Sequence, residues 1–225
     1  MNETLLKTPL DAAHRKAGGR MVPFAGYVMP VQYSSIIAES KAVRDGWGVF
    51  DVSHMARLAL TGERVLEYLE WVTTNDVGML KDAQGHYSLL PNDSGGLVDD
   101  IIVYRIHGTE FRMVVNASNH AKDVAWLASK NSFGVKMVDE TEWTAMLAVQ
   151  GPSATENLAS MSDQPDAVRD AGLFGVVRAS FGGVSCFAAR SGYTGEDGYE
   201  LVCDSAHAER LWDALMERGA TACGL

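Results

Sequence analysis

The sequence predicts an α+β fold of two related lobes, each combining helices with an antiparallel sheet. Along the 225 residues, a group of strand-like segments is followed by a helix-like segment, and this order occurs twice. Within each group, short turns join strand-like segments that are close in sequence, as antiparallel neighbours require. We therefore expect a first lobe at residues 1–134 and a second lobe at residues 135–225.

Composition and charge are those of an ordinary globular protein, with 47% hydrophobic and 21% charged residues. The net charge of −10 disfavours nonspecific binding to nucleic acid or to anionic membranes. No apolar run reaches the ~18 residues that a membrane span needs, and residues 1–9 lack the apolar core of a signal peptide. The three cysteines are widely spaced and form neither a CxxC pair nor a disulfide framework, so we expect a cytoplasmic protein.

Helix and strand signals alternate in the first half of the chain. A helix capped by Ser34 or Ser35 should end at Gly46. Apolar residues at helical spacing predict another helix between residues 63 and 74. The other elements expected here are a short amphipathic segment from Thr8 to Gly19, an irregular or extended stretch at 21–33, a strand at 57–60 and a helix at 119–130.

The second half repeats the order of strands followed by helices. Gly151-Pro152 should open a helix, because proline is well tolerated at the first helical position. The polar stretch 161–170 has the composition of a loop, and Gly182-Gly183 should form the turn of a hairpin. The other elements expected here are strands at 135–138, 144–149, 175–181, 184–189 and 201–203, and a helix at 206–218 that stops at Gly219.

The most informative segment runs from Ser94 to Arg105, where a glycine turn leads into an apolar strand that contains Asp99 and Asp100. Strands at 86–90 and 111–116 should flank it in a three-stranded antiparallel meander. Successive side chains alternate between the faces of a strand, and both faces here are otherwise apolar, so at least one carboxylate must point into a largely dry environment. Such a group needs a partner. A ligand and a neighbouring turn amide both remain open as that partner.

A second unusual segment, Gly192 to Glu200, reads Gly-Tyr-Thr-Gly-Glu-Asp-Gly-Tyr-Glu. Its glycines permit close approach of the backbone to a ligand. Tyr193 could stack on a flat ligand, and Glu200 could accept paired hydrogen bonds from a heteroaromatic amino group and ring N–H. The alternative interpretation is a surface turn with solvated acids. The segment is neither a GxGxxG nor a Walker motif.

The segment Phe50 to Met55 places aspartate, serine and histidine close together in the sequence. A catalytic triad is disfavoured, because no GxSxG elbow surrounds Ser53 and sequence neighbours seldom form a triad. The histidines are too scattered for a metal site, so we expect none. Asn116 either hydrogen-bonds a ligand or caps the helix that follows it.

Taken together, these motifs resemble the aminomethyltransferase family, the T-protein of the glycine cleavage system. The resemblance covers nearly the whole chain, and the motifs occur in the family's order. They are Thr8-Pro9-Leu10, Met21 to Tyr27, Pro30 to Tyr33, Phe50 to Met55, Ser94 to Tyr104, Val114 to Asn116, Val149 to Pro152 and Gly192 to Glu196.

The resemblance implies an enzyme that uses tetrahydrofolate as cosubstrate. It would take an aminomethyl group from the lipoyl arm of the H-protein, its partner among the glycine cleavage components, and release ammonia and 5,10-methylenetetrahydrofolate. By the same resemblance, Asp100 is the catalytic acid/base near folate N10, and Glu200 holds the pterin edge. The other residues implied to line the folate pocket are Met55, Tyr87, Asn116 and Tyr193.

Members of this family continue beyond the position of Leu225, first with an arginine-bearing segment that contacts the folate. We therefore expect the family's third lobe and C-terminal β domain to be absent from this chain. We also expect the isolated chain to be far less active than a full-length relative.

Two other functions are compatible with this resemblance. One is folate-dependent demethylation, as in the folate domains of sarcosine and dimethylglycine oxidases. The other is non-catalytic folate binding, as in relatives that assist iron–sulfur assembly. Those relatives carry a cysteine in a Lys-Gly-Cys-type motif, and Gly192 to Gly195 has none here.

Overall fold

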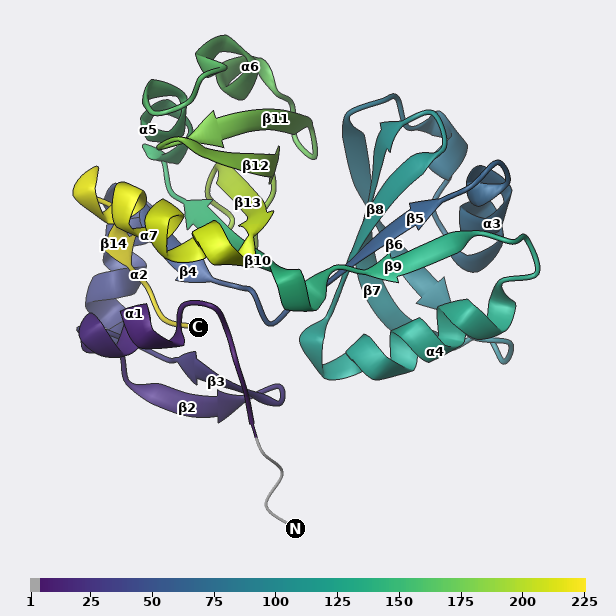
Figure 1. The fold of residues 1–225 in the computed structure, drawn as a ribbon, viewed down its shortest axis with the longest axis horizontal. Helices are drawn as coiled ribbons and strands as arrows, with labels where there is room; N and C mark the ends of the chain where they lie inside the picture. The colour runs from purple at the N-terminus through teal and green to yellow at the C-terminus, as the bar shows by residue number, and fades with distance from the viewer. Residues whose placement is uncertain (1–4) are drawn as a thin grey trace. The chain divides into compact units, whose positions relative to one another are not determined.

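The computed structural model describes residues 5–225 and divides the chain into two compact units (Figure 1). The first unit comprises Met1–His54, Glu142–Leu173 and Val177–Leu225, and the second comprises Met55–Thr141 and Phe174–Val176. This division differs from the continuous lobes 1–134 and 135–225 that we expected. The reason is the strand Gly48–Asp51, which pairs with two strands from the C-terminal part of the chain and so brings the first 54 residues into their sheet.

The elements have the following bounds. The helices are α1 Asp11–Lys16, α2 Ile36–Asp45, α3 Val65–Val72, α4 His120–Lys130, α5 Ala154–Ser160, α6 Pro165–Asp170 and α7 Ala208–Glu217. Short 3-10 turns occur at η1 Val77–Met79, η2 Ala117–Asn119, η3 Thr141–Trp143 and η4 Ser205–His207. The strands are β1 Leu6–Lys7, β2 Met21–Phe24, β3 Tyr27–Pro30, β4 Gly48–Asp51, β5 Ala56–Thr61, β6 Gln84–Pro91, β7 Leu97–His107, β8 Glu110–Val115, β9 Lys136–Asp139, β10 Thr144–Gln150, β11 Val176–Phe181, β12 Val184–Ala189, β13 Gly198–Asp204 and β14 Thr221–Ala222.

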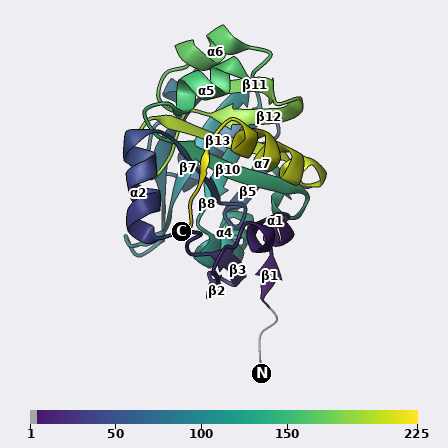
Figure 2. The ribbon, with the colours of Figure 1, turned by 90° about the vertical axis from the view of Figure 1, so that its left-hand side faces the viewer.

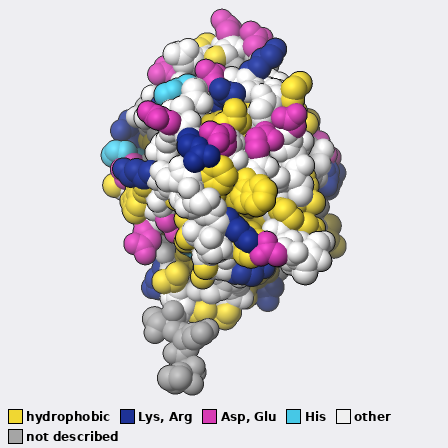
Figure 3. Space-filling model, turned by 90° about the vertical axis from the view of Figure 1, so that its right-hand side faces the viewer, with side chains coloured by type: hydrophobic (Ala, Val, Ile, Leu, Met, Phe, Trp, Pro, Cys, Tyr) yellow, Lys and Arg dark blue, Asp and Glu magenta, His cyan; other side chains and the backbone are white. Residues whose placement is uncertain are grey.

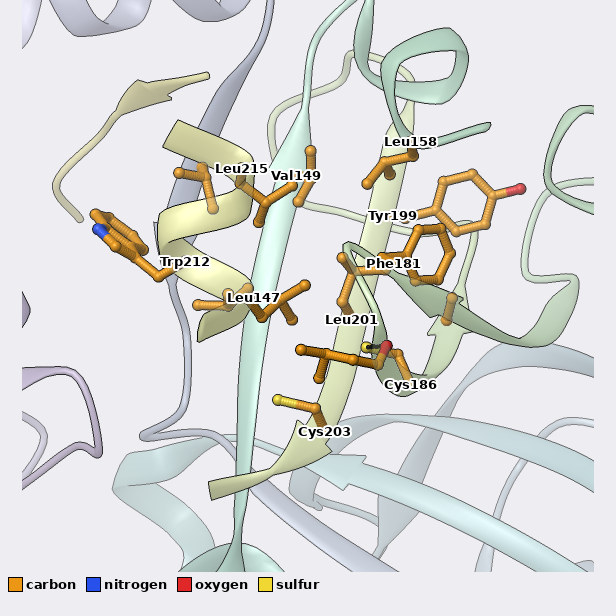
Figure 4. Close-up of a cluster of buried hydrophobic side chains, with 14 of the residues drawn as sticks. Leu147, Val149, Leu158, Phe181, Cys186, Tyr199, Leu201, Cys203, Trp212 and Leu215 are labelled. Carbon is orange, nitrogen blue, oxygen red and sulfur yellow. Dashed lines mark hydrogen bonds between the residues drawn. The ribbon is translucent and has the colours of Figure 1, made fainter. Parts of the chain in front are cut away.

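The first unit is built on a six-stranded sheet in the order β11-β12-β13-β10-β4-β14. Helix α7 lies against this sheet (Figure 2) and contributes Trp212 and Leu215 to the buried cluster. Figure 4 shows these two side chains beside Leu147 and Val149 of β10. A small three-stranded sheet, β1-β3-β2, completes the unit.

The second unit is a five-stranded sheet in the order β6-β7-β8-β5-β9, so the predicted antiparallel meander with the paired aspartates on its middle strand is confirmed. Helices α3 and α4 cover one face, where Tyr68 and Leu127 join a buried cluster with Ile101 and Val103. The opposite face of β7 carries Asp100, Ile102 and Tyr104. Both faces of this strand are therefore buried over most of its length, as the sequence predicted.

The helix signals were accurate at α2 and inaccurate around residue 160. The Ser35 hydroxyl accepts a hydrogen bond from Ala38 N at 3.2 Å, and the helix ends before Gly46 as predicted. Pro152 does not occupy the first helical position, because α5 begins only at Ala154. The stretch expected as a loop at 161–170 contains α6, which begins at Pro165.

Surface and side-chain chemistry agree with the composition. On the face in Figure 3, acidic, basic and apolar side chains are interspersed. Cys186, Cys203 and Cys223 are free and buried. Within residues 5–225, no helix is long and apolar enough to cross a membrane, and no group of three or more histidine, cysteine or acidic side chains is placed to hold a metal ion. Residues 1–4, part of the segment 1–9 that was expected to lack a signal peptide, lie outside the described residues.

Candidate functional site

The two carboxylates of β7 have different surroundings. Asp99 points to the face covered by α4 and is only 6% exposed, whereas Asp100 lies on the opposite face and is half-buried. The expectation that one of the pair is kept dry is confirmed, but that carboxylate is Asp99. Asp100, to which the resemblance assigns the chemistry, is the less buried of the two carboxylates.

Asp99 is held by a dense set of donors from the segment after β8. Asn116 donates to it from its backbone N at 3.0 Å and from its side-chain Nδ2 at 3.1 Å, and Asn119 donates from Nδ2 at 2.5 Å. Burial alone would raise the pKa of Asp99, but hydrogen bonds from Asp123, Asn116 and Asn119 bring it below its usual value. The protein therefore keeps Asp99 ionised.

Asp123 of α4 neighbours Asp99 and is fully buried, and both of its carboxyl oxygens lack a hydrogen-bond donor among the described residues. Burial and the adjacent Asp99 carboxylate raise the pKa of Asp123 to about 8. At neutral pH it carries a proton that it can donate to Asp99, so the pair bears a single negative charge.

Asp100 is bound by Asn116 and Tyr87. The Asn116 Nδ2 atom lies 3.0 Å from Asp100 Oδ1 and 3.1 Å from the Asp100 carbonyl oxygen. Burial is the largest cause that raises the pKa of Tyr87. The Asp100 carboxylate, which accepts a hydrogen bond from the Tyr87 hydroxyl, raises this pKa further. Asn116 does not cap the following turn with its side chain. Of the two roles left open for it, capping is therefore excluded.

Strand register explains why the predicted residues of this unit converge. Ala56 pairs with Val115, and Val115 pairs with Ile101, so the next residue along each strand, Met55, Asn116 and Asp100 respectively, extends the same row. Tyr87 pairs with Ile102 in the row before it. Because alternate side chains share a face, Tyr87 and Asp100 belong to the face opposite the helices. Met55 and Asn116 lie just beyond the ends of β5 and β8, and the Asn116 side chain contacts both aspartates.

Glu200 and Tyr193, the remaining predicted residues, belong to the first unit. Glu200 is 6% exposed on β13, and its Oε2 atom accepts a hydrogen bond from the Ser191 hydroxyl at 2.7 Å. Burial raises the pKa of Glu200 more than Ser191 lowers it. A buried carboxylate with so few donors is suited to a ligand that brings N–H groups of its own.

The glycines around Glu200 fit a close-packed loop over Gln150. A Cβ atom on Gly192 would lie 1.9 Å from the Gln150 side-chain oxygen, so only glycine fits there. The other acids of the segment are not simply solvated, because Glu196 pairs with Arg44 at 2.8 Å and Asp197 pairs with Arg190 at 2.8 Å. These two acids are therefore paired with arginines at the surface.

Tyr193 is 70% exposed and lies at the edge of a cavity of about 280 Å³ in the first unit. Phe50, Arg44 and Thr194 also line this cavity. An exposed aromatic ring beside a cavity provides a surface on which a flat ring can stack.

A buried network that the sequence did not reveal lies under β4. Asp51 Oδ2 accepts hydrogen bonds from the Thr8 hydroxyl at 2.5 Å and lies 2.8 Å from His14 Nε2, and the Tyr33 hydroxyl lies 2.8 Å from His14 Nδ1. The Ser53 backbone N also donates to Asp51 Oδ1 at 2.9 Å, and the Ser53 hydroxyl bonds the backbone of β10 at Met146. Because His14 and Asp51 are 37 positions apart, no local motif could have signalled the pair.

Comparison with known proteins gives a family and a fold. Residues 10–225 match the GCVT N-terminal domain. The chain is 49% identical over 231 residues to an aminomethyltransferase of Deinococcus deserti, covering 99% of this chain and 62% of that protein. It is 32% identical, with a TM-score of 0.88, to a crystal structure of the glycine cleavage system aminomethyltransferase T from Bartonella henselae, covering 98% of this chain and 60% of that one.

A more distant structure shares the fold alone. It is the heterotetrameric sarcosine oxidase from Corynebacterium sp. U-96 in complex with pyrrole 2-carboxylate, at 18% identity and a TM-score of 0.56. The match covers 83% of this chain and 93% of that one. Against the aminomethyltransferases compared above, this chain spans about three fifths of their length.

Proposed function

Because the chain belongs to the GCVT N-terminal domain family, we propose that it acts in aminomethyl transfer to tetrahydrofolate. In this reaction the aminomethyl group leaves a lipoyl sulfur of the H-protein. Its carbon bridges N5 and N10 of the folate, ammonia is released, and the lipoyl group is left as a dithiol. The observation that carries the proposal is the placement of Asp100 beside its donors Asn116 and Tyr87.

Asp100 supplies the chemistry in this proposal. An ionised carboxylate beside folate N10 accepts the proton that this nitrogen must lose, and it stabilises positive charge on the carbon being transferred. The Asn116 amide fixes one carboxylate oxygen at 3.0 Å, so the group is oriented before substrate arrives.

The other predicted residues bind the folate. Glu200, buried and bonded only lightly by Ser191, accepts hydrogen bonds from the pterin amino group and ring N–H. Tyr193 offers its exposed ring for stacking. Tyr87, Met55 and Asn116 contact the cosubstrate near Asp100.

The partners follow from the same chemistry. The one-carbon donor is the lipoylated H-protein, with the other glycine cleavage components completing the cycle. A cytoplasmic location belongs to the proposal, and it is supported by three cysteines that are all free thiols.

Replacing Glu200 by alanine should weaken tetrahydrofolate binding at least tenfold. The variant removes two charge-assisted hydrogen bonds to the pterin, each worth roughly 1.5–3 kcal/mol. Titration of tetrahydrofolate against the purified chain, followed by intrinsic fluorescence or calorimetry, measures the change.

Glu196→Gln is the matched control, since Glu196 lies in the same segment but pairs with Arg44 at the surface. Its dissociation constant should stay within about threefold of the unmodified chain. Equal losses in both variants would show that Glu200 has no special part in binding.

A further inference from the structure

We propose that Asp123 is a positioning residue: its carboxyl group donates a hydrogen bond to Asp99 and, through the Asn116 amide that Asp99 and Asp100 share, fixes the Asp100 carboxylate. The assignment rests on the proposed function only in so far as Asp100 is the acting group. The physical linkage between the three aspartates stands on contacts within the second unit.

The linkage begins with two neighbouring buried carboxyl groups, those of Asp123 and Asp99. Asp123 is fully buried on α4, and Asp99 is 6% exposed on β7. An ionised Asp123 would leave both of its buried carboxyl oxygens without a donor among the described residues, whereas a protonated Asp123 can donate to the neighbouring Asp99 carboxylate. Two carboxylates this close in a dry site cannot both ionise, so one of them must hold a proton. Asp99 already accepts three hydrogen bonds from Asn116 and Asn119, which leaves Asp123 as the donor.

The second step is the side chain of Asn116. Its Nδ2 atom lies 3.1 Å from Asp99 Oδ1 and 3.0 Å from Asp100 Oδ1. A single amide group therefore contacts the buried carboxylate on one face of the strand and the half-buried carboxylate on the other. If Asp99 turns, the amide follows it, and Asp100 loses a donor.

The third step is the charge around Asp123. Asp99 and Asp100 of β7 both disfavour its ionisation, whereas Lys122 of its own helix favours it. The Lys122 ammonium group donates to the Val98 carbonyl oxygen at 2.6 Å. With Asp123 protonated at neutral pH, the pair keeps one negative charge and Asp100 is spared a second repulsive neighbour.

Carbon-13 NMR of chain labelled at the aspartate carboxyl groups tests the pairing without any substrate. We expect one aspartate to titrate near pH 8 in the unmodified chain, and Asp123→Asn to remove that step. Absence of any aspartate that titrates above pH 6 would overturn the assignment.

Two substitutions then test the positioning. Asp123→Asn keeps the size of the residue and an N–H donor for Asp99, so the Asp100 carboxyl resonance and tetrahydrofolate affinity should match the unmodified chain. Asp123→Ala removes the donor, so the Asp100 resonance should shift and the affinity or the transfer rate should fall about tenfold.

The unfolding midpoint of the chain should also depend on pH through Asp123. The pKa of Asp123 is raised in the folded state, so its contribution to stability is fully present below the unfolded pKa of about 4. The unmodified chain should therefore lose stability as pH rises from about 4 towards 8. The Asp123→Asn variant should lose less stability over the same range.

Asp93→Asn is the control for a change of one charge. The Asp93 side chain is 78% exposed and lies in the turn between β6 and β7, the strand that carries Asp99 and Asp100. It should leave the Asp100 resonance unmoved. If Asp123→Ala folds and also leaves that resonance unmoved, Asp123 is merely structural. A chain that binds no tetrahydrofolate would refute the proposed function, while the NMR results would still decide the linkage.

Discussion

Replacing Asp100 by asparagine should slow aminomethyl transfer by about a thousandfold while changing the tetrahydrofolate dissociation constant by less than about threefold. Asparagine keeps the size of the side chain and an oxygen for the Asn116 amide, which lies 3.0 Å from Asp100 Oδ1. It cannot take up a proton or carry the charge that stabilises a cationic one-carbon centre. A single-turnover assay with aminomethylated H-protein and tetrahydrofolate, scored by ammonia and 5,10-methylenetetrahydrofolate, measures the rate.

Asp93→Asn again supplies the control, because it changes the same charge at an exposed position of the second unit. Its transfer rate should equal that of the unmodified chain. A similar small loss in both variants would remove Asp100 from the chemistry. Unfolding of Asp100→Asn, seen by circular dichroism, would show that the carboxylate serves the strand.

Replacing His14 by alanine should lower the free energy of unfolding of the first unit by about 3–5 kcal/mol. The Asp51 carboxylate is fully buried beside His14, and removing the His14 ring leaves this buried charge without its main partner. Burial would raise the pKa of Asp51, but hydrogen bonds from His14, Ser53 and Thr8 lower it below its usual value. Because a lowered folded pKa stabilises the protein above the unfolded value of about 3.9, this contribution should be lost as pH falls below about 4.

Urea unfolding at pH 7 measures the effect, with His107→Ala as the control. The His107 side chain is 68% exposed and pairs with Glu110 at the surface, so its loss should cost less than about 1 kcal/mol. In an Asp51→Asn background the cost of His14→Ala should shrink, because no buried charge is left unpaired. Equal costs in both backgrounds would mean that packing against Trp212, not the contact with Asp51, makes His14 important.

Sequence alone could place the half of the candidate site that depends on strand alternation. The apolar strand around Asp99 and Asp100, with its flanking strands, determines which residues share a face. Met55 and Tyr87 were implied by the family resemblance alone, and the register then brings the ends of β5 and β8, next to Met55 and Asn116, beside Asp100. Glu200 could also be singled out from the sequence, because its segment leads directly into a strand.

Side chains that meet only through tertiary packing could not be placed in this way. Which carboxylate of the pair is buried depends on Asp123, which approaches Asp99 from a helix 24 positions later. The spacing of Asn119 and Asp123, one helical turn apart, was a signal for this contact, because such residues share a helix face. Helix α6 was missed because half of its six residues are charged and Val168 alone is buried.

The most direct test follows the Asp100 carboxyl resonance while tetrahydrofolate is titrated into the carbon-13-labelled chain. A carboxylate beside folate N10 should give a saturable shift, and Glu200→Ala should move the midpoint at least tenfold higher without changing the end point. Binding that leaves the Asp100 resonance in place would contradict the assignment of Asp100 to the one-carbon chemistry.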